Sequence, residues 1–267
     1  MATRPPLVNV MVGAIFKVAR KLLRDFNEVE QLQVSEKGPR DFVSTADITA
    51  DRALREELST ARPRFGFLTE EGAPVRGEDP GSRWIIDPLD GTLNYLHSLP
   101  HFAISVAVEV NGKLMAGVIY DPLRDELFWA ERGRGAFLND RRLRVSARGR
   151  MQDALVGTGG PLHKPEAEDY NETLGRLIAA TASYRRSGSA ALDLAYIAAG
   201  RLDGYWAVGL SPWDVAAGII MIREAGGFVT ADDGRAVSLS GPTLLATNEK
   251  LHGDFVGIIK NRATMRI

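Results

Sequence analysis

The sequence contains no cysteine among its 267 residues. This absence excludes disulfide bridges, thiolate metal ligands and cysteine nucleophiles. Proteins of a reducing compartment have no use for disulfides, and we therefore expect a cytoplasmic protein.

The chain also lacks a strong charge imbalance and a long apolar run. Its formal net charge is -1 at pH 7, so no overall field attracts nucleic acid or an anionic membrane. No apolar segment approaches the roughly 20 residues of a membrane span. We expect no membrane association and no direct nucleic-acid binding, and we interpret the basic segment 141–150 as a solvated edge.

The apolar N-terminal segment "LVNVMVGAIF" resembles a signal peptide in composition only. Basic residues follow it at once, and no small-residue cleavage site lies between them. Apolar residues instead recur at helical spacing from Leu7 to Phe26, which predicts an amphipathic helix.

Helical and strand patterns alternate along the rest of the chain. Helices are predicted over 44–58, 174–184, 189–200 and 211–227, and strands over 65–71, 83–87, 103–121 and 203–208. Pro88 is expected to end the second of these strands, and Asn111-Gly112 and Asn139-Asp140 predict hairpin turns. The pattern predicts a mixed α/β protein in alternating layers, with a single domain over 1–267 whose halves are 1–148 and 149–267.

One stretch, "WIIDPLDGTLNYLHSLPHF", ends an apolar strand with Asp87 and Asp90 and contains no lysine or arginine. Two carboxylates so close together need a compensating positive charge, and a metal ion can supply it. Glu70 ends another predicted strand, while Asp214 and Asp47 lie near the starts of helices. Oxygen ligands alone suit Mg²⁺ or Mn²⁺, and metal pairs about 4 Å apart commonly serve phosphate-ester hydrolysis.

The residues that follow Asp90 suit an anion. Gly91 allows the backbone to approach a ligand closely, and Thr92 adds a hydroxyl. Backbone N–H groups there could hold phosphate oxygens. The sequence thus places a candidate cation site beside a candidate phosphate site.

Two stretches, "WIIDPLDGTLNYLHSLPHFAISVAV" and "PWDVAAGIIMIREAGG", closely resemble the two signature motifs of the inositol monophosphatase family. The resemblance continues in "DFVSTAD", "FLTEEG", "GVIYDP", "RGRGAFLND" and "RRSGSAALDLAYIAAGRLDGYW", and it covers nearly the whole chain. It implies an α+β fold, a layered αβαβα sandwich. It also implies a lithium-sensitive, homodimeric phosphatase that uses two or three Mg²⁺ ions per site, or Mn²⁺, to hydrolyse a small phosphorylated metabolite, inositol monophosphate first of all.

The resemblance also implies roles for individual residues. Metal ligands are implied to be Glu70, Asp87, the carbonyl of Leu89, Asp90 and Asp214. A metal-bound water attacks phosphorus and is oriented by Glu70 and Thr92, with Asp47 as the acidic partner of Thr92. Substrate contacts are implied for Asp90, Gly91, Thr92, Gly188, Ser189, Ala190, Ala207 and Asp214.

The chain departs from the family pattern at two positions. Leu93 replaces a second threonine after Gly91-Thr92, and we expect catalysis to survive this change. Ala207 stands where inositol-active members usually carry a glutamate that binds substrate hydroxyls, so a broader substrate range is expected.

Histidinol phosphate, fructose bisphosphate and phosphoadenosine phosphate remain alternative substrates. A protein-binding role in ribosomal RNA transcription remains an alternative of another kind, whereas the lack of an Asp-rich loop disfavours a Ca²⁺-binding module.

Other conspicuous residues have simpler interpretations. Asp51 is interpreted as a surface charge one helical turn after Asp47, and the glycine-rich segment 157–161 as a turn rather than a nucleotide loop. Arg185 and Arg186 could attract a phosphate or shape a dimer interface, and the sequence leaves both readings open.

Overall fold

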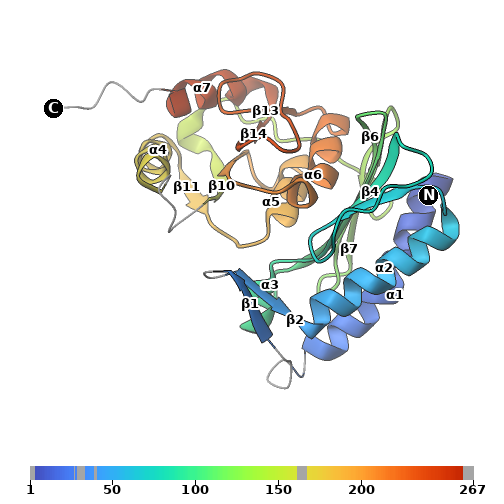
Figure 1. Ribbon diagram of the computed structural model, residues 1–267. Coiled ribbons are helices and arrows are strands. Elements are labelled where there is room, and N and C mark those ends of the chain that lie inside the picture. The colour runs from blue at the N-terminus through green and yellow to red at the C-terminus, as the bar shows by residue number, and fades with distance from the viewer. Residues whose placement is uncertain (1–3, 27, 29–33, 39–40, 161–166, 261–267) are drawn as a thin grey trace.

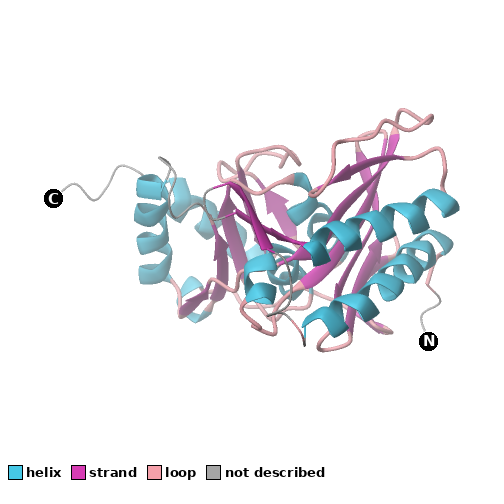
Figure 2. Ribbon diagram, turned by 60° about the horizontal axis from the view of Figure 1, so that its bottom comes forward, coloured by secondary structure: helices cyan, strands magenta, loops and turns pink. Residues whose placement is uncertain are grey.

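The computed structural model of the chain describes residues 4–26, 28, 34–38, 41–160 and 167–260. These residues form two sheets with helices on their outer faces and between them (Figures 1 and 2). The helices are α1 (Pro6–Phe26), α2 (Thr45–Ala61), α3 (Thr92–Leu96), α4 (Ala167–Ala180), α5 (Ala190–Ala198), α6 (Pro212–Glu224) and α7 (Glu249–Lys260), with a short 3-10 helix at Met151–Asp153.

The larger sheet comes from the first half of the chain. Its strands, in spatial order, are β3 (Gly66–Thr69), β4 (Ser82–Asp90), β5 (Ala103–Val110), β6 (Lys113–Asp121), β7 (Glu126–Glu131), β8 (Gly135–Leu138) and β9 (Arg141–Arg142). Only β3 and β4 pair in parallel, and the other neighbours are antiparallel. The two predicted hairpins are present, and Asn111, Gly112 and Asn139 adopt the positive φ that such turns favour.

The smaller sheet comes from the second half, and a separate hairpin precedes α2. In the order β11-β10-β12-β14-β13, the strands of the sheet are β10 (Leu155–Gly159), β11 (Ser183–Arg185), β12 (Gly204–Val208), β13 (Phe228–Thr230) and β14 (Thr243–Thr247). The hairpin pairs β1 (Val34–Gly38) with β2 (Asp41–Ser44).

The elements stack as five layers. Helices α1 and α2 cover the outer face of the larger sheet, α5 and α6 lie between the two sheets, and α7 packs on the smaller sheet beside α4 (Figure 1). The αβαβα sandwich implied by the resemblance is confirmed. Three apolar clusters fill the interfaces between layers: one lies under α1 and α2, one surrounds α5 and α6 and reaches both sheets, and one lies between the smaller sheet and α4 and α7.

Three local predictions were wrong. β4 runs through Pro88 to Asp90, because one extra residue bulges out between the pairs Asp87↔Ser105 and Asp90↔Ala103, where a proline without an N–H is tolerated. Residues 157–159 continue strand β10 instead of turning, since Gly157 and Gly159 sit where a Cβ would strike Tyr205. The helix predicted over 174–184 ends at Ala180, and its last residues form β11.

None of the helices in the described residues combines the length and the apolar character that crossing a membrane requires.

Candidate active site

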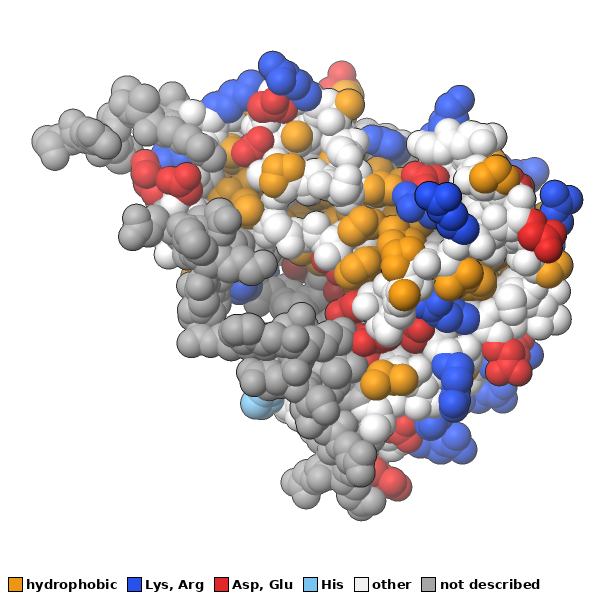
Figure 3. Space-filling model, viewed as in Figure 1, with side chains coloured by type: hydrophobic (Ala, Val, Ile, Leu, Met, Phe, Trp, Pro, Cys, Tyr) orange, Lys and Arg blue, Asp and Glu red, His pale blue; other side chains and the backbone are white. Residues whose placement is uncertain are grey.

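Three aspartates meet where β4 ends and α6 begins. Carboxylate oxygens of Asp87, Asp90 and Asp214 lie within 4.8 Å of one another. Asp87 and Asp90 are buried and lie on either side of the bulge in β4, while Asp214 is half-buried in the first turn of α6. The bulge brings both β4 aspartates to one place, although they are an odd number of residues apart. The space-filling view shows a hollow in this face of the molecule with acidic side chains along its edge (Figure 3).

Glu70 lies beside this cluster, directly after the neighbouring strand β3. β3 and β4 are parallel and pair Thr69 with Ile86, and the N–H of Glu70 donates to the carbonyl of Ile86 at 3.2 Å. The residue after Thr69 therefore lies alongside the residue after Ile86, which is Asp87. Among the neighbouring charges, that of Glu70 raises the pKa of Asp87 the most.

The acidic cluster is strained electrostatically. Burial, followed by the charges of Glu70, Asp90 and Asp214, raises the pKa of Asp87 well above its usual range, against a lowering by the backbone N–H of Leu89. In the described residues neither Asp87 nor Asp90 forms an ion pair with a lysine or arginine. A buried cluster of this kind favours either protons or a bound cation.

Asp90 is held by the start of α5. The hydroxyl of Ser189 donates to Oδ2, and the backbone N–H groups of Ala190 and Ala191 donate to Oδ1 and Oδ2 at 3.2 and 3.0 Å. A carboxylate is favoured there because a helix N-terminus carries unpaired N–H groups and a positive partial charge. Burial still prevails and raises the pKa of Asp90 to about 6.

Thr92 connects the site to α2. Its Oγ1 lies 2.9 Å from Oδ1 of Asp47 and 3.0 Å from the carbonyl oxygen of Leu89. The hydroxyl has one proton, so it donates to one of these oxygens at a time. Asp47 is buried in the first turn of α2, and the structure thus brings the predicted pair Asp47 and Thr92 together.

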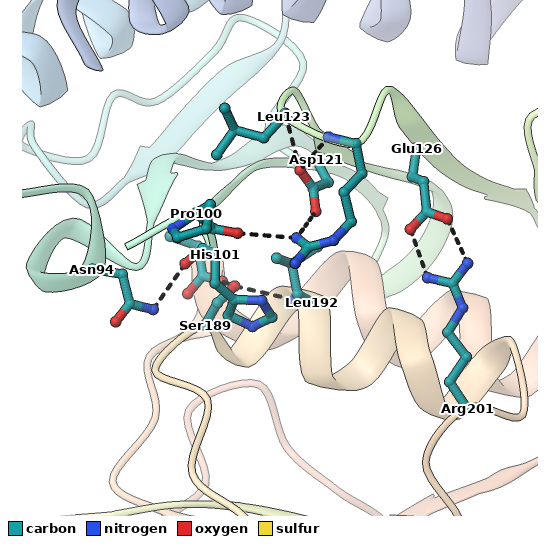
Figure 4. Close-up of polar contacts among 11 residues, drawn as sticks. Asn94, Pro100, His101, Asp121, Leu123, Glu126, Ser189, Leu192 and Arg201 are labelled. Atoms are coloured by element: carbon teal, nitrogen blue, oxygen red, sulfur yellow. Dashed lines mark hydrogen bonds and ion pairs between the residues drawn. The ribbon is translucent and has the colours of Figure 1, made fainter. Parts of the chain in front are cut away.

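A glycine turn joins the two halves of the site. Gly91 has φ 95, and a Cβ there would lie 3.0 Å from the carbonyl of His101 and 3.3 Å from that of Gly188. Asn94, in α3, fixes the same two segments, since its Nδ2 donates to the carbonyls of His101 and Ser187 at 2.8 and 2.9 Å. Figure 4 shows Asn94 and His101 beside Ser189 at the start of α5.

Ala207 lies on β12, on the same face as Tyr205, because side chains two residues apart in a strand point the same way. The charges of Asp193, Asp90 and Asp214 raise the pKa of the Tyr205 hydroxyl, after burial as the main cause. The face of β12 that carries Tyr205 and Ala207 therefore points toward the acidic cluster. Ala207 is fully buried. A Cβ added at Gly159 would lie 3.5 Å from the Cβ of Ala207.

The interpretation of Asp51 as a surface charge was wrong. Asp51 is buried, and its Oδ2 accepts from Nε of Arg55 at 2.7 Å. Arg55 in turn donates to the hydroxyl of Thr69, the last residue of β3 before Glu70. The face of α2 that carries Asp47 packs on the sheet, so the aspartate one turn later is also enclosed.

Sequence reasoning missed two residues near the cluster. Asn94 comes shortly after the Gly91-Thr92 pair in the chain. That position is the one feature of the sequence that could have pointed to its hydrogen bond with Ser187. Asp193, one turn after Ser189 in α5, is buried with one oxygen unpaired, and burial raises its pKa to about 8. A charged residue in an otherwise apolar helix was the available signal.

The donor set fits a hard divalent cation, since it consists of carboxylate oxygens whose mutual repulsion a cation would relieve. A layered αβαβα sandwich that gathers such oxygens beside a Gly-Thr turn defines a class of metal-dependent phosphatases. The chain belongs to the inositol monophosphatase family, whose sequence model matches residues 4–263. It is therefore a phosphatase.

Individual relatives agree with this placement. An inositol-1-monophosphatase of Rhizobium meliloti is 53% identical, covering 93% of this chain and 94% of its own. The Nus factor SuhB of Escherichia coli is 42% identical over 84% and 85% of the two chains. The crystal structure of extragenic suppressor protein suhB from Bartonella henselae superposes with a TM-score of 0.94 at 51% identity, covering 97% of this chain and 100% of that one.

Proposed function

We propose that the protein hydrolyses the phosphate ester of a small polyol, with inositol monophosphate as its first substrate and Mg²⁺ as its cofactor. The observation that carries this proposal is the cluster of Asp87, Asp90 and Asp214 directly before the turn at Gly91. The names of the rhizobial relatives support the choice of substrate.

The carboxylates Glu70, Asp87, Asp90 and Asp214 and the carbonyl of Leu89 would hold the cation. A divalent cation bound there supplies the positive charge that draws a phosphate to an acidic surface, and it lowers the pKa of water. The hydrogen bonds from Ser189, Ala190 and Ala191 favour the ionised form of the Asp90 carboxylate and fix its orientation.

Glu70 and Thr92 would orient the attacking water. When the hydroxyl of Thr92 donates to Asp47, its lone pairs are free to accept a hydrogen bond from the attacking water. Glu70 is half-buried at the edge of the cluster and can take the other proton as a general base. Asp47 thus acts as a positioning residue, because its charge sets the direction of the threonine hydroxyl.

The turn at Gly91-Thr92 would bind the phosphate. Gly91 has a positive φ, and a Cβ there would lie 3.3 Å from the carbonyl of Gly188, so Gly188 and Ala190 would flank the bound phosphate. The alcohol part of the substrate would then lie toward β12, where the buried Ala207 offers no hydrogen bond.

The test is phosphate release from a panel of phosphorylated metabolites. Inositol monophosphate, histidinol phosphate, fructose bisphosphate and phosphoadenosine phosphate are compared with Mg²⁺, with Mn²⁺ and with excess chelator. We expect hydrolysis of inositol monophosphate with either metal, inhibition by lithium and no turnover in chelator. Full activity in chelator would contradict the metal site, and activity on another member of the panel alone would contradict the substrate.

A protein-binding role in transcription is a second candidate, because one relative carries the name Nus factor SuhB. We further propose that the protein is a cytoplasmic homodimer. Light scattering tests the dimer. Capture of transcription proteins with the wild type and with a catalytically inactive variant tests the second role, which fails if neither form captures them.

A further inference from the structure

A second pocket lies away from the acidic cluster, at the other ends of the elements that carry it. Its cavity of about 310 Å³ is within the range of small-ligand sites. Arg83 lies in β4 four residues before Asp87, and Arg223 lies in α6 nine residues after Asp214. At about 3.3 Å per strand residue and 1.5 Å per helix residue, each lies roughly 13 Å from the acidic cluster.

The pocket is basic, although the whole chain carries a net charge of -1. Four cations and two hydroxyls line it together with an apolar floor, and Glu109 is its one carboxylate. The polar groups are Arg83, Lys113, Arg132, Arg223, Ser238 and Ser240. Glu109 is already paired with Arg83, whose Nε lies 2.6 Å from its Oε2.

The remaining cations are not neutralised by the protein. Within the described part of the chain, neither Arg223 nor Lys113 has a hydrogen-bond acceptor or an ion-pair partner for its side chain. Nε of Arg132 donates to the carbonyl of Leu114 at 3.0 Å, which fixes that guanidinium without neutralising it. Burial and the charge of Arg132 lower the pKa of Arg223.

The acids nearest in sequence are engaged elsewhere. Both oxygens of Glu224 accept from backbone N–H groups, of Gly133 and Gly135, at 2.8 Å. Glu131 forms an ion pair with Arg134 at 2.5 Å. Two neighbouring, solvent-exposed guanidinium groups are thus left together at an open pocket, an arrangement that an anion with several oxygens would stabilise.

We propose that this pocket binds a phosphate group, either inorganic phosphate or the phosphate of a small ester, at a site separate from the acidic cluster. Arg132 and Arg223 supply paired N–H donors, Lys113 supplies a point charge from the β5–β6 hairpin, and Ser238 and Ser240 supply hydroxyl donors. A phosphate has enough acceptor oxygens to satisfy these donors at once. The site does not depend on the proposed polyol substrate.

The test is calorimetric titration of the full chain with inorganic phosphate and with glycerol 2-phosphate, in excess chelator and at constant ionic strength. Without metal the acidic cluster repels both probes, so binding there does not interfere. We expect a measurable dissociation constant for at least one probe. Binding by inorganic phosphate identifies the free ion as sufficient, and binding by the ester alone identifies the ester as the source.

Arg132→Gln combined with Arg223→Gln should weaken binding at least tenfold. The matched control is Arg64→Gln combined with Arg235→Gln, which removes the same charge from exposed arginines that lie outside the pocket and pair only with surface acids. Lys113→Gln, at the exposed first residue of β6, is a second variant that tests the pocket if the double variant unfolds. Absence of binding by the wild type, or equal weakening in the control, would overturn the proposal.

Discussion

Asp90 shows how one residue serves two environments. Its carboxylate accepts hydrogen bonds from the start of α5 and also faces Asp87 and Asp214. The hydrogen bonds from α5 hold the carboxylate in place, and the position beside Asp87 and Asp214 makes its charge available to a cation. A replacement that keeps the side-chain volume therefore tests metal binding without disturbing the packing.

Asp90→Asn should abolish turnover while the fold persists. The change keeps the side-chain volume and removes one ligand charge, so we expect a loss of several kcal/mol of transition-state stabilisation, on the order of a thousandfold in rate or more. Phosphate release and circular dichroism are the measurements. Asp254→Asn, in the exposed part of α7, is the control. Near-normal Mg²⁺-dependent turnover by the Asp90 variant would show that the cluster is not the metal site.

Ala207 should determine selectivity. A residue that hydrogen-bonds a substrate hydroxyl disfavours substrates without one, and alanine cannot do this. We expect the wild type to accept glycerol 2-phosphate or nucleoside monophosphates within roughly tenfold of inositol monophosphate, since one hydrogen bond to a charged group contributes about 1.5–3 kcal/mol. Ala207→Glu should widen the gap in kcat/KM.

Ala207→Gln is the matched control for that experiment, because it adds the same volume at a buried position without the charge. Thermal unfolding of both variants separates a change in selectivity from a loss of stability. A wild type that already prefers inositol monophosphate by a thousandfold, with no gain in the glutamate variant, would show that other residues set the specificity.

Among the elements, α3 and α5 decide how the site is assembled. α3 follows the turn at Gly91, and α5 begins at Ala190, after Gly188 and the N-cap Ser189. These elements are about 100 residues apart in sequence, and Asn94 joins the segments beside them. The phosphate turn and the wall opposite it thus depend on one side-chain amide.

Asn94→Ala should lower both stability and activity. It removes two hydrogen bonds to carbonyls, each with a net contribution of about 0.5–1.5 kcal/mol, so we expect a loss of about 1–3 kcal/mol in the free energy of unfolding. Because the 187–190 segment is then less well fixed, kcat should fall as well. The measurements are denaturant unfolding and phosphate release. Asn9→Ala, which removes one exposed hydrogen bond to Arg4, is the control, and equal effects of the two would contradict this role.

At the scale of the whole molecule, the acidic cluster opposes folding unless its charge is neutralised. The pKa of Asp90 in the fold is about 6, against an ordinary value of 3.8, and that of Asp87 is raised as well. The folded state therefore holds protons more tightly than the unfolded state. The associated stability is complete below about pH 4 and is lost as the pH rises through about 6.

In chelator, the contribution of this cluster to stability should decrease from about pH 4 to pH 6 and above, whereas bound Mg²⁺ should restore it. We expect the difference in unfolding temperature between Mg²⁺ and chelator to grow over this range, because the cation competes with protons for the same oxygens. Differential scanning calorimetry at matched ionic strength measures it. A difference that stays constant with pH would contradict the assignment of these carboxylates.

The sequence by itself determined the type of several elements, whereas it gave no prediction for α7, β13 and β14. Asn111-Gly112 predicted a hairpin, the pattern over 211–227 predicted α6, and helical spacing predicted α1. Local rules suffice here because turn geometry, helix caps and amphipathic faces act over a few residues. The grouping of Asp87, Asp90 and Asp214 was also predicted, because strand ends and helix starts gather at one edge of a layered protein.

Only the tertiary structure decided how those elements modify one another. Pro88 stays within β4 because a bulge opposite β5 removes the need for its N–H, and Asp51 is buried because α2 turns that face toward the sheet. Segments that are distant in the chain meet at two places. The start of α5 donates hydrogen bonds to Asp90, and several segments line the basic pocket around Arg223. Burial, charge repulsion and unpaired donors depend on all the neighbours in space, and a sequence pattern records only the neighbours along the chain.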